Sequence, residues 1–199
     1  MIDIDISNNV DIDILNNESQ IFYLARESCK SPIISDFIRI SKKVEELNLN
    51  YLVEKIVISI KNGKRMIING LNQEYQNINY NDIIEIVDYD PIKKIILVLG
   101  KTKPVPETTL HWIIQNARDD INAIIQINVN EKQINKLPNL PKTNTKYSPY
   151  SLEFAKEILP LLRNNNIIII NNQTILFADR SLNEVEKLFF DKIGGLNEG

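Results

Sequence analysis

Residues 106–125, PETTLHWIIQNARDDINAII, combine two periodicities and decide the fold that the sequence predicts. The first half carries apolar residues at the spacing of one helix face: Leu110, Ile113, Ile114 and Ala117. This spacing predicts a helix with one buried side. After the polar break at Asp119 and Asp120, the run from Ile121 is short and apolar, which predicts a buried strand. A helix that leads directly into such a strand indicates an α/β protein.

The flanking sequence alternates strands and helices in the same way. A hairpin is predicted where two β-branched runs meet at Asn62-Gly63, since both residues of such a turn need positive φ. The other predicted elements are a helix opened by Ser31 and Pro32, strands at 83–90 and 93–100 joined at Asp90-Pro91, a short helix at 131–137, a helix opened by Ser148-Pro149 that Pro160 kinks or ends, strands at 167–170 and 174–178, and a last helix opened by the capping box Ser181-x-x-Glu184. No repeat or linker interrupts this pattern. We therefore predict one α/β domain over residues 1–199, with a mostly antiparallel sheet and helices on its faces.

The N-terminal stretch MIDIDISNNVDIDIL alternates apolar and acidic residues, which predicts a hairpin that turns at Asn8-Asn9. Its acidic residues are Asp3, Asp5, Asp11 and Asp13. They can bind a hard cation such as Ca²⁺, or they can serve as the charges that keep an edge strand from aggregating. A short helix is predicted from Glu18 to Cys29. Residues 1–30 can therefore be an addition to the main domain.

Composition excludes several classes of protein. The 199 residues carry a net charge of −3, so no basic surface for nucleic acid or acidic membranes is expected. No apolar run approaches the roughly 18 residues of a membrane helix, and the N-terminus is unlike a signal peptide. The single cysteine, Cys29, cannot form an internal disulfide, which favours the cytoplasm. Cys29 can be a reactive thiol beside Lys30 or a packing residue.

Three stretches in this order resemble the class II aldolase/adducin family: NYNDIIEIVDYD (79–90), PETTLHWIIQNARDDINAII (106–125) and FADRSLNEVEKL (177–188). The resemblance extends from about Ser31 to Phe190. It implies a three-layer α/β/α sandwich around a central, mostly antiparallel sheet. For active members it also implies a zinc-dependent lyase of sugar phosphates.

The resemblance places the three zinc-binding histidines of active members at Gln126, Asn128 and Gln173. All three carry a neutral carboxamide, whose oxygen is a weak ligand for zinc compared with the nitrogen of an imidazole. We therefore expect no zinc site and no metal cofactor.

The phosphate-binding residues implied by the resemblance are also altered. The equivalent positions are Lys55, Asn69 and Gly70, and Glu54 beside Lys55 would repel a phosphate. Where the family has two serines before a glutamate, this sequence has Val105 and Pro106. A small sugar phosphate as ligand is therefore a weaker expectation than the fold.

Glu107 occupies the family's acid/base position, and His111 lies four residues later on the same helix face. The two side chains can act as a proton shuttle. Alternatively, Glu107 complements the helix dipole and His111 is a structural histidine. Trp112 and Tyr147 can line a pocket or serve in packing.

Two functions follow from these residues. The first is an adducin-like binding or assembly module, a pseudoenzyme that has lost zinc-dependent aldolase activity and forms a homo-oligomer, a tetramer by resemblance. The alternative is a sugar-phosphate aldolase/epimerase-type lyase that acts with an unusual metal or none, through Glu107 and His111. An unrelated α/β binding domain is the third possibility, and the path of the backbone decides it.

Overall fold

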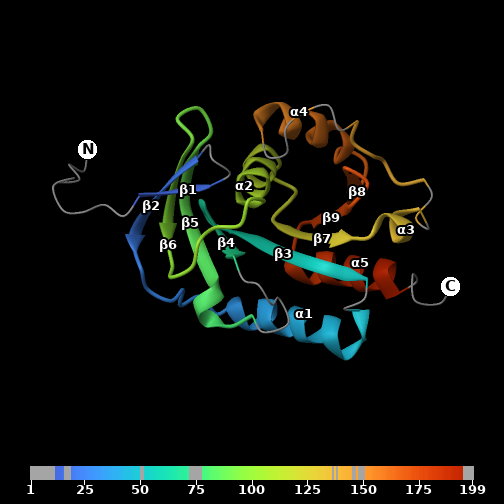
Figure 1. Cartoon of the computed structure of the whole chain (residues 1–199), viewed down its shortest axis with the longest axis horizontal. Helices are drawn as coiled ribbons and strands as arrows, with labels where there is room; N and C mark the ends of the chain where they lie inside the picture. Colours follow the sequence, from blue (N-terminus) through green and yellow to red (C-terminus); the bar gives the residue numbers. More distant parts are fainter. Residues whose placement is uncertain are drawn as a thin grey trace.

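The computed structural model describes residues 12–15, 19–49, 52–71, 78–135, 137, 139–144, 147 and 151–194. Within these ranges the chain forms one nine-stranded sheet with helices on both of its faces (Figure 1). The predicted α/β class is confirmed.

Strands and helices alternate along the chain in the predicted way. The strands are β1 (Ile12–Leu15), β2 (Ser19–Ala25), β3 (Val53–Asn62), β4 (Arg65–Asn69), β5 (Ile83–Asp90), β6 (Ile95–Leu99), β7 (Ala123–Val129), β8 (Ile167–Ile170) and β9 (Thr174–Asp179). The helices are α1 (Ile34–Glu46), α2 (Thr108–Ala117), α3 (Glu131–Ile134), α4 (Leu152–Leu161) and α5 (Leu182–Gly194), with a 3₁₀ turn at Tyr80–Asp82.

The sheet has the strand order β1-β2-β6-β5-β4-β3-β7-β9-β8. Of its described pairs, only β2 with β6 runs parallel, and every other pair is antiparallel. The predicted, mostly antiparallel sheet is therefore confirmed. The longest strand, β3, and its neighbour β7 lie in the interior of the sheet and pair along most of their lengths.

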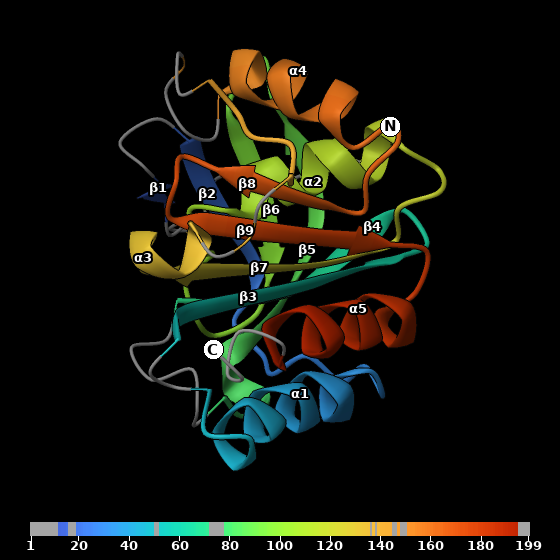
Figure 2. The same ribbon diagram turned by 90° about the vertical axis from the view of Figure 1, so that its right-hand side faces the viewer.

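Helices cover the two faces of this sheet in pairs (Figure 2). Helices α1 and α5 pack on one face, and α2 and α4 pack on the other. The alternation of β7 shows why both faces are apolar, because Ile125 and Ile127 belong to the cluster under α1 and α5 while Ile124 belongs to the cluster under α2 and α4. The three-layer α/β/α sandwich is therefore confirmed.

The predicted helix from Glu18 to Cys29 is wrong, because Ser19–Ala25 form strand β2. Ile21 and Tyr23 alternate toward a core cluster that contains Trp112, and the backbone of β2 pairs with β6. Tertiary pairing with a distant strand therefore decides a local pattern that is ambiguous on its own.

The N-terminal prediction is only partly within the described residues. The observed hairpin joins β1 to β2, with Ile12 opposite Phe22. Asn8, Asn9, Asp3, Asp5 and Asp11 lie outside the described residues, and Asp13 is placed by its backbone alone.

The hairpin of β3 and β4 is confirmed, but its turn is one residue later than predicted. Asn62 pairs with Arg65, so Gly63 and Lys64 form the two-residue loop. Gly63 has a φ of +64°, and Asn62 stays in the strand. Glycine at the first position of a two-residue loop is typical of a type II′ turn.

Helix ends follow the predicted cap chemistry in part. Ser181 caps α5, since its Oγ accepts the N–H of Glu184 at 3.3 Å, and α4 ends one residue after Pro160, both as predicted. Helix α4 begins with Ser151 as cap, and Ser148 and Pro149 lie outside the described residues. The predicted cap of α1 at Ser31 is wrong, because Ile33 is the N-cap and has no side-chain hydrogen bond. No helix in the described ranges is both long and apolar enough to cross a membrane.

Candidate functional site

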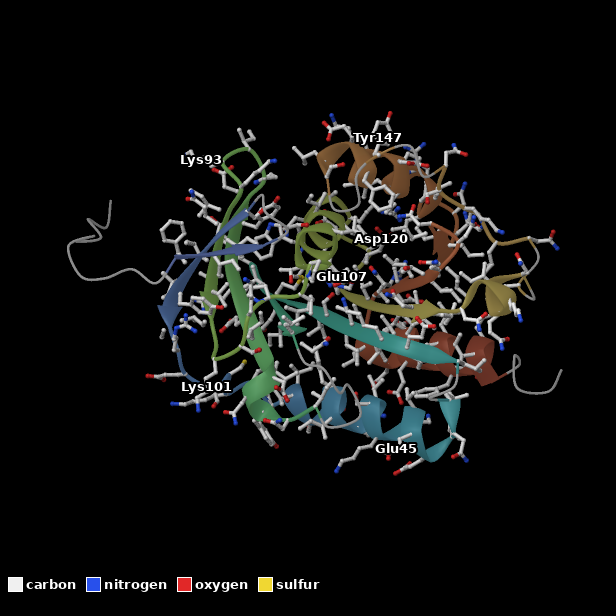
Figure 3. The ribbon with its side chains drawn as sticks, in the orientation of Figure 1. Glu45, Lys93, Lys101, Glu107, Asp120 and Tyr147 are labelled. Atoms are coloured by element: carbon white, nitrogen blue, oxygen red, sulfur yellow. The ribbon has the colours of Figure 1, made fainter. Side chains whose placement is uncertain are left out.

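A group of polar side chains lies between α2 and the sheet, where most other interlayer residues are apolar. We call it the interlayer polar cluster, and it consists of Lys55, Ser59, Glu107, His111, Gln115 and Gln126. Figure 3 shows Glu107 near the middle of the molecule, whereas Lys93 and Glu45 lie at its periphery.

Sequence spacing explains how the cluster assembles. Glu107, His111 and Gln115 are four residues apart and so follow one face of α2. Lys55 and Ser59 are separated by an even number of positions on β3, which puts both on one face of the sheet. Residues that lie far apart in the chain therefore converge because α2 packs across β3 and β7.

Lys55 and Glu107 form an ion pair with both carboxylate oxygens. The Lys55 Nζ lies 2.7 Å from Oε1 and 2.8 Å from Oε2 of Glu107. The Glu107 side chain is 3% exposed and the Lys55 side chain 34% exposed, so the pair reaches from the interior toward solvent. Because Glu107 is the N-cap residue of α2, its carboxylate also complements the positive end of the helix dipole.

His111 is fully buried, and both of its ring nitrogens have partners. Nδ1 lies 2.9 Å from Ser59 Oγ, and Nε2 lies 3.1 Å from Gln126 Oε1. Burial lowers the pKa of His111 from 6.5 to about 4; the Gln126 contact and the charge of Glu107 oppose this shift, and Lys55 adds to it. The imidazole is therefore neutral at pH 7. A carboxamide oxygen can only accept, so Nε2–H donates to Gln126 and Nδ1 accepts from Ser59.

Gln115 extends this chain of hydrogen bonds to the far side of Ser59. Its Nε2 donates to Ser59 Oγ at 3.0 Å and to the carbonyl of Asn122 at 3.3 Å. Its Oε1 is buried and has no partner among the described residues. Lys61 Nζ donates to the backbone carbonyl of Gln115 at 2.9 Å. These hydrogen bonds therefore fix the His111 ring from both sides and link α2 to β3 and β7.

The three positions that the resemblance assigns to zinc ligands do not fit a zinc ion. Gln126 Oε1 accepts from His111, and Asn128 Oδ1 accepts from the Thr174 hydroxyl at 3.1 Å. Gln173 is exposed in the turn before β9. Their donor atoms are neutral amides, and the described residues include no group of three His, Cys, Asp or Glu side chains placed to hold a metal.

The three phosphate-site equivalents are engaged in contacts of the fold itself. Lys55 is paired with Glu107. Both ends of the buried Asn69 carboxamide bond to the backbone of β3, with Oδ1 accepting an N–H at 2.6 Å and Nδ2 donating to a carbonyl at 3.2 Å. The N–H of Gly70 donates to the carbonyl of Asp82 at 2.6 Å. Their proposed role in phosphate binding stays a prediction.

The remaining single residues are placed as follows. Trp112 is buried in the core cluster that contains Ile21 and Val57, so it serves in packing there. Tyr147 is 45% exposed beside Glu153, at a shallow surface pocket. Cys29 is half-buried against the core under α1, and burial raises the pKa of its thiol. A protonated, packed thiol favours the packing alternative for Cys29.

Ser59 and Gln115 are not among the site residues predicted from the sequence, although both leave a signal in it. Ser59 is a polar residue inside the apolar run of β3, and Gln115 lies one helical turn after His111. Only the tertiary structure shows that these two side chains meet.

Comparison with known proteins identifies the fold. No protein-family model and no curated protein matches the sequence. An L-fuculose 1-phosphate aldolase has 21% identity and a TM-score of 0.63, with 86% of this chain and 88% of that chain covered. A sugar-phosphate aldolase from Thermotoga maritima has 11% identity and a TM-score of 0.61, covering 83% and 93%. The N-terminal class II aldolase domain of a conserved protein from Thermoplasma acidophilum has 14% identity and a TM-score of 0.59, covering 87% and 95%. The backbone path is therefore that of the class II aldolases, as the resemblance predicted.

Proposed function

We propose that this chain is a class II aldolase-fold protein that acts by binding or assembly and has lost zinc-dependent aldol cleavage. The observation that supports this proposal is the contact between His111 and Gln126. Gln126, at the first zinc-ligand position, accepts a hydrogen bond from the neutral, buried imidazole of His111. Its carboxamide oxygen is therefore engaged in a contact that stabilises the fold.

The chemistry of aldol cleavage explains why this exchange matters. Breaking the carbon–carbon bond leaves negative charge on the product, and an electrophile must stabilise it. Neutral carboxamides at Gln126, Asn128 and Gln173 do not supply the nitrogen ligands that hold zinc. In addition, the Lys55 ammonium donates to both oxygens of Glu107, so uptake of a proton by this carboxylate would compete with the ion pair.

The proposal is tested with the purified full-length chain. We expect less than stoichiometric metal by mass spectrometry, and no thermal shift of several degrees with zinc, manganese or L-fuculose 1-phosphate. As a matched control, the variant Gln126→Ala should give the same metal content as the wild type. Stoichiometric zinc in the wild type that Gln126→Ala loses would overturn the proposal.

A second function is favoured by one specific observation, the partial exposure of Lys55 beside the buried Glu107. The lysine ammonium is a fixed positive charge next to the family's acid/base position, and solvent reaches it. We propose as the alternative a lyase of small sugar phosphates that acts through Glu107 and His111 without the usual metal.

This alternative is tested by cleavage of L-fuculose 1-phosphate after treatment of the protein with a chelator. Turnover that Glu107→Gln and His111→Gln each reduce at least about 100-fold would establish the lyase and reject the binding module. Absence of turnover in the chelated and in the zinc-supplemented wild type would reject the lyase for this substrate.

A further inference from the structure

A cavity of about 320 Å³ lies at the end of the sheet opposite to Asn128 and Gln173. We call it the distal pocket, and its walls come from the C-terminal ends of α2 and α4, the start of β7 and the passage from β9 to α5. Ala123 at this end of β7 pairs with Asp179, whereas Asn128 at the other end pairs with Thr174. In Figure 2 the end of β9 that leads into α5 is on the right, and the turn between β8 and β9 is on the left. About 17 Å of strand therefore separates the distal pocket from Asn128.

The floor of the distal pocket is apolar and firmly packed. It consists of Ile121, Leu162 and Ala178, which are 4%, 2% and 2% exposed. All three belong to the core cluster between α2, α4 and the sheet. Small-molecule pockets usually have about 300–1,000 Å³, so this cavity suits a small metabolite with an aliphatic group.

Several polar side chains of the walls are held in place by each other. Arg118 Nε and Nη2 donate to the two carboxylate oxygens of Asp120 at 2.8 and 2.7 Å, a bidentate pair. On Asp179, Oδ2 accepts from Asn166 Nδ2 and Oδ1 accepts the backbone N–H of Arg180, both at 2.8 Å. The pocket is therefore bordered by an ordered polar rim.

Two charged groups of the rim remain available to a ligand. The Arg180 guanidinium makes no hydrogen bond or ion pair within the described part of the chain. It lies close enough to Asp120 to act on it, because the pKa of Asp120 is lowered first by the hydrogen bond from Arg118 and also by the charge of Arg180. Glu184 Oε2 accepts the Ser181 hydroxyl at 2.8 Å, and Oε1 has no partner among the described residues.

The charge of the lining selects the class of ligand. Two arginines and three carboxylates give the lining a net charge of −1; they are Arg118, Arg180, Asp120, Asp179 and Glu184. A phosphate dianion would add to this excess of negative charge, and a simple cation would leave the guanidinium of Arg180 unused. A zwitterion matches one free cation and one free carboxylate oxygen and leaves the net charge unchanged.

We propose that the distal pocket binds a free aliphatic α-amino acid. Its carboxylate pairs with the Arg180 guanidinium, whose planar donors match a carboxylate, and its ammonium pairs with Glu184. Its side chain packs on the floor of Ile121, Leu162 and Ala178. This site goes beyond the proposed function and shares no residue with the interlayer polar cluster.

The first test compares three probes of similar shape on the full-length wild type by isothermal titration calorimetry. L-Valine carries both charges, isovalerate lacks the ammonium and isobutylamine lacks the carboxylate. We expect L-valine to bind with a dissociation constant of about 1 mM or tighter, and each of the other two to bind at least about 10-fold more weakly. This comparison needs no variant, so it does not depend on how a variant folds.

The second test uses two arginine variants that differ in where the arginine lies. Arg163 is exposed next to Leu162 but does not line the pocket, so Arg163→Gln is the matched control for Arg180→Gln. We expect Arg180→Gln to weaken L-valine binding at least about 10-fold and Arg163→Gln to leave it unchanged. Glu184→Gln keeps the capping box of α5 and should also weaken binding about 10-fold, because the ammonium loses its carboxylate.

Thermal unfolding of the variants checks that each keeps the fold. Absence of binding of L-alanine, L-valine and L-leucine up to about 10 mM overturns the proposal. Equal binding of isovalerate or isobutylamine overturns it as well, and so does an equal loss in Arg163→Gln and Arg180→Gln. No metal or sugar phosphate enters these tests, so their failure is distinguishable from failure of the zinc test.

Discussion

His111 is the only histidine in the chain, and its surroundings decide what it can do. With Nδ1 accepting from Ser59 and Nε2–H donating to Gln126, the ring can neither donate a further hydrogen bond nor accept one without breaking this chain. Its neutral form is therefore part of the folded structure.

The titration of His111 should make stability depend on pH. Its pKa is about 4 in the folded protein and 6.5 ordinarily, so the unfolded chain takes up the proton first as the pH falls. The free energy of unfolding should therefore lose about 3 kcal/mol from this group between pH 6.5 and pH 4, and nothing above that range. Urea unfolding at several pH values measures it, with His111→Gln as the control that removes this titration from the pH dependence.

Carboxylates also titrate in this range, so the difference between the wild type and His111→Gln is the decisive quantity. The single imidazole signal in proton NMR provides a direct check, and we expect its midpoint near pH 4. A midpoint near 6.5 would show that His111 is solvated and that the hydrogen-bond chain does not hold it.

The ion pair of Lys55 and Glu107 gives a second prediction at the scale of residues. Lys55→Met should lower the free energy of unfolding at pH 7 by about 2 kcal/mol, because the buried carboxylate of Glu107 then lacks its lysine. The loss is smaller than for a fully buried pair, since Lys55 is partly exposed to solvent. Adding Glu107→Gln should recover part of this loss, since the charge is then gone. A double-mutant cycle by urea unfolding measures the coupling, and an interaction energy of zero would contradict the pair.

At the scale of elements, Gly70 shows how tightly the end of β4 meets the loop after β6. A Cβ at Gly70 would clash with Thr102 Cγ2 and lie 2.9 Å from the carbonyl oxygen of Lys103. Gly70→Ala should therefore lower the free energy of unfolding by about 3 kcal/mol, because the neighbour on one side is backbone that cannot move alone.

Gly63→Ala is the matched control for this prediction. Gly63 has a φ of +64° and nothing within 4 Å of the added Cβ, so only backbone strain of about 1 kcal/mol is expected. Thermal unfolding of both variants makes the comparison. Equal losses would mean that the close approach at Gly70 relaxes at no cost. The double variant Gly70→Ala/Thr102→Ser should regain only the part of the lost unfolding free energy that the clash with Thr102 causes.

At the scale of the whole molecule, the three core clusters share their central strands. In β3, Ile56 and Ile58 pack under α1 and α5, and Val57 packs toward Trp112. In β7, Ile124 and Ile125 divide between opposite faces in the same way. Neither layer of helices can therefore leave without exposing a face of the strands that the other layer needs.

This sharing predicts a single cooperative unfolding transition. Trp112 is the only tryptophan and is 7% exposed, so its fluorescence reports on the layer of α2. Far-ultraviolet circular dichroism reports on all helices and strands together. We expect coincident transitions with urea by both probes, as in one domain. A fluorescence change that precedes the loss of secondary structure would separate α2 and its strands as an independent unit.

The sequence by itself determined the α/β class, the mostly antiparallel sheet and most elements, because helix and strand periods are local properties of the chain. It also determined the absence of imidazoles at Gln126, Asn128 and Gln173, which depends on residue identity alone. Only the tertiary structure decided that 19–25 form a strand, since the parallel partner β6 lies about 75 residues away in the chain. It likewise decided that Lys55 binds Glu107 and that Ser59 and Gln126 hold His111, because burial and contact between distant residues arise only when the layers pack.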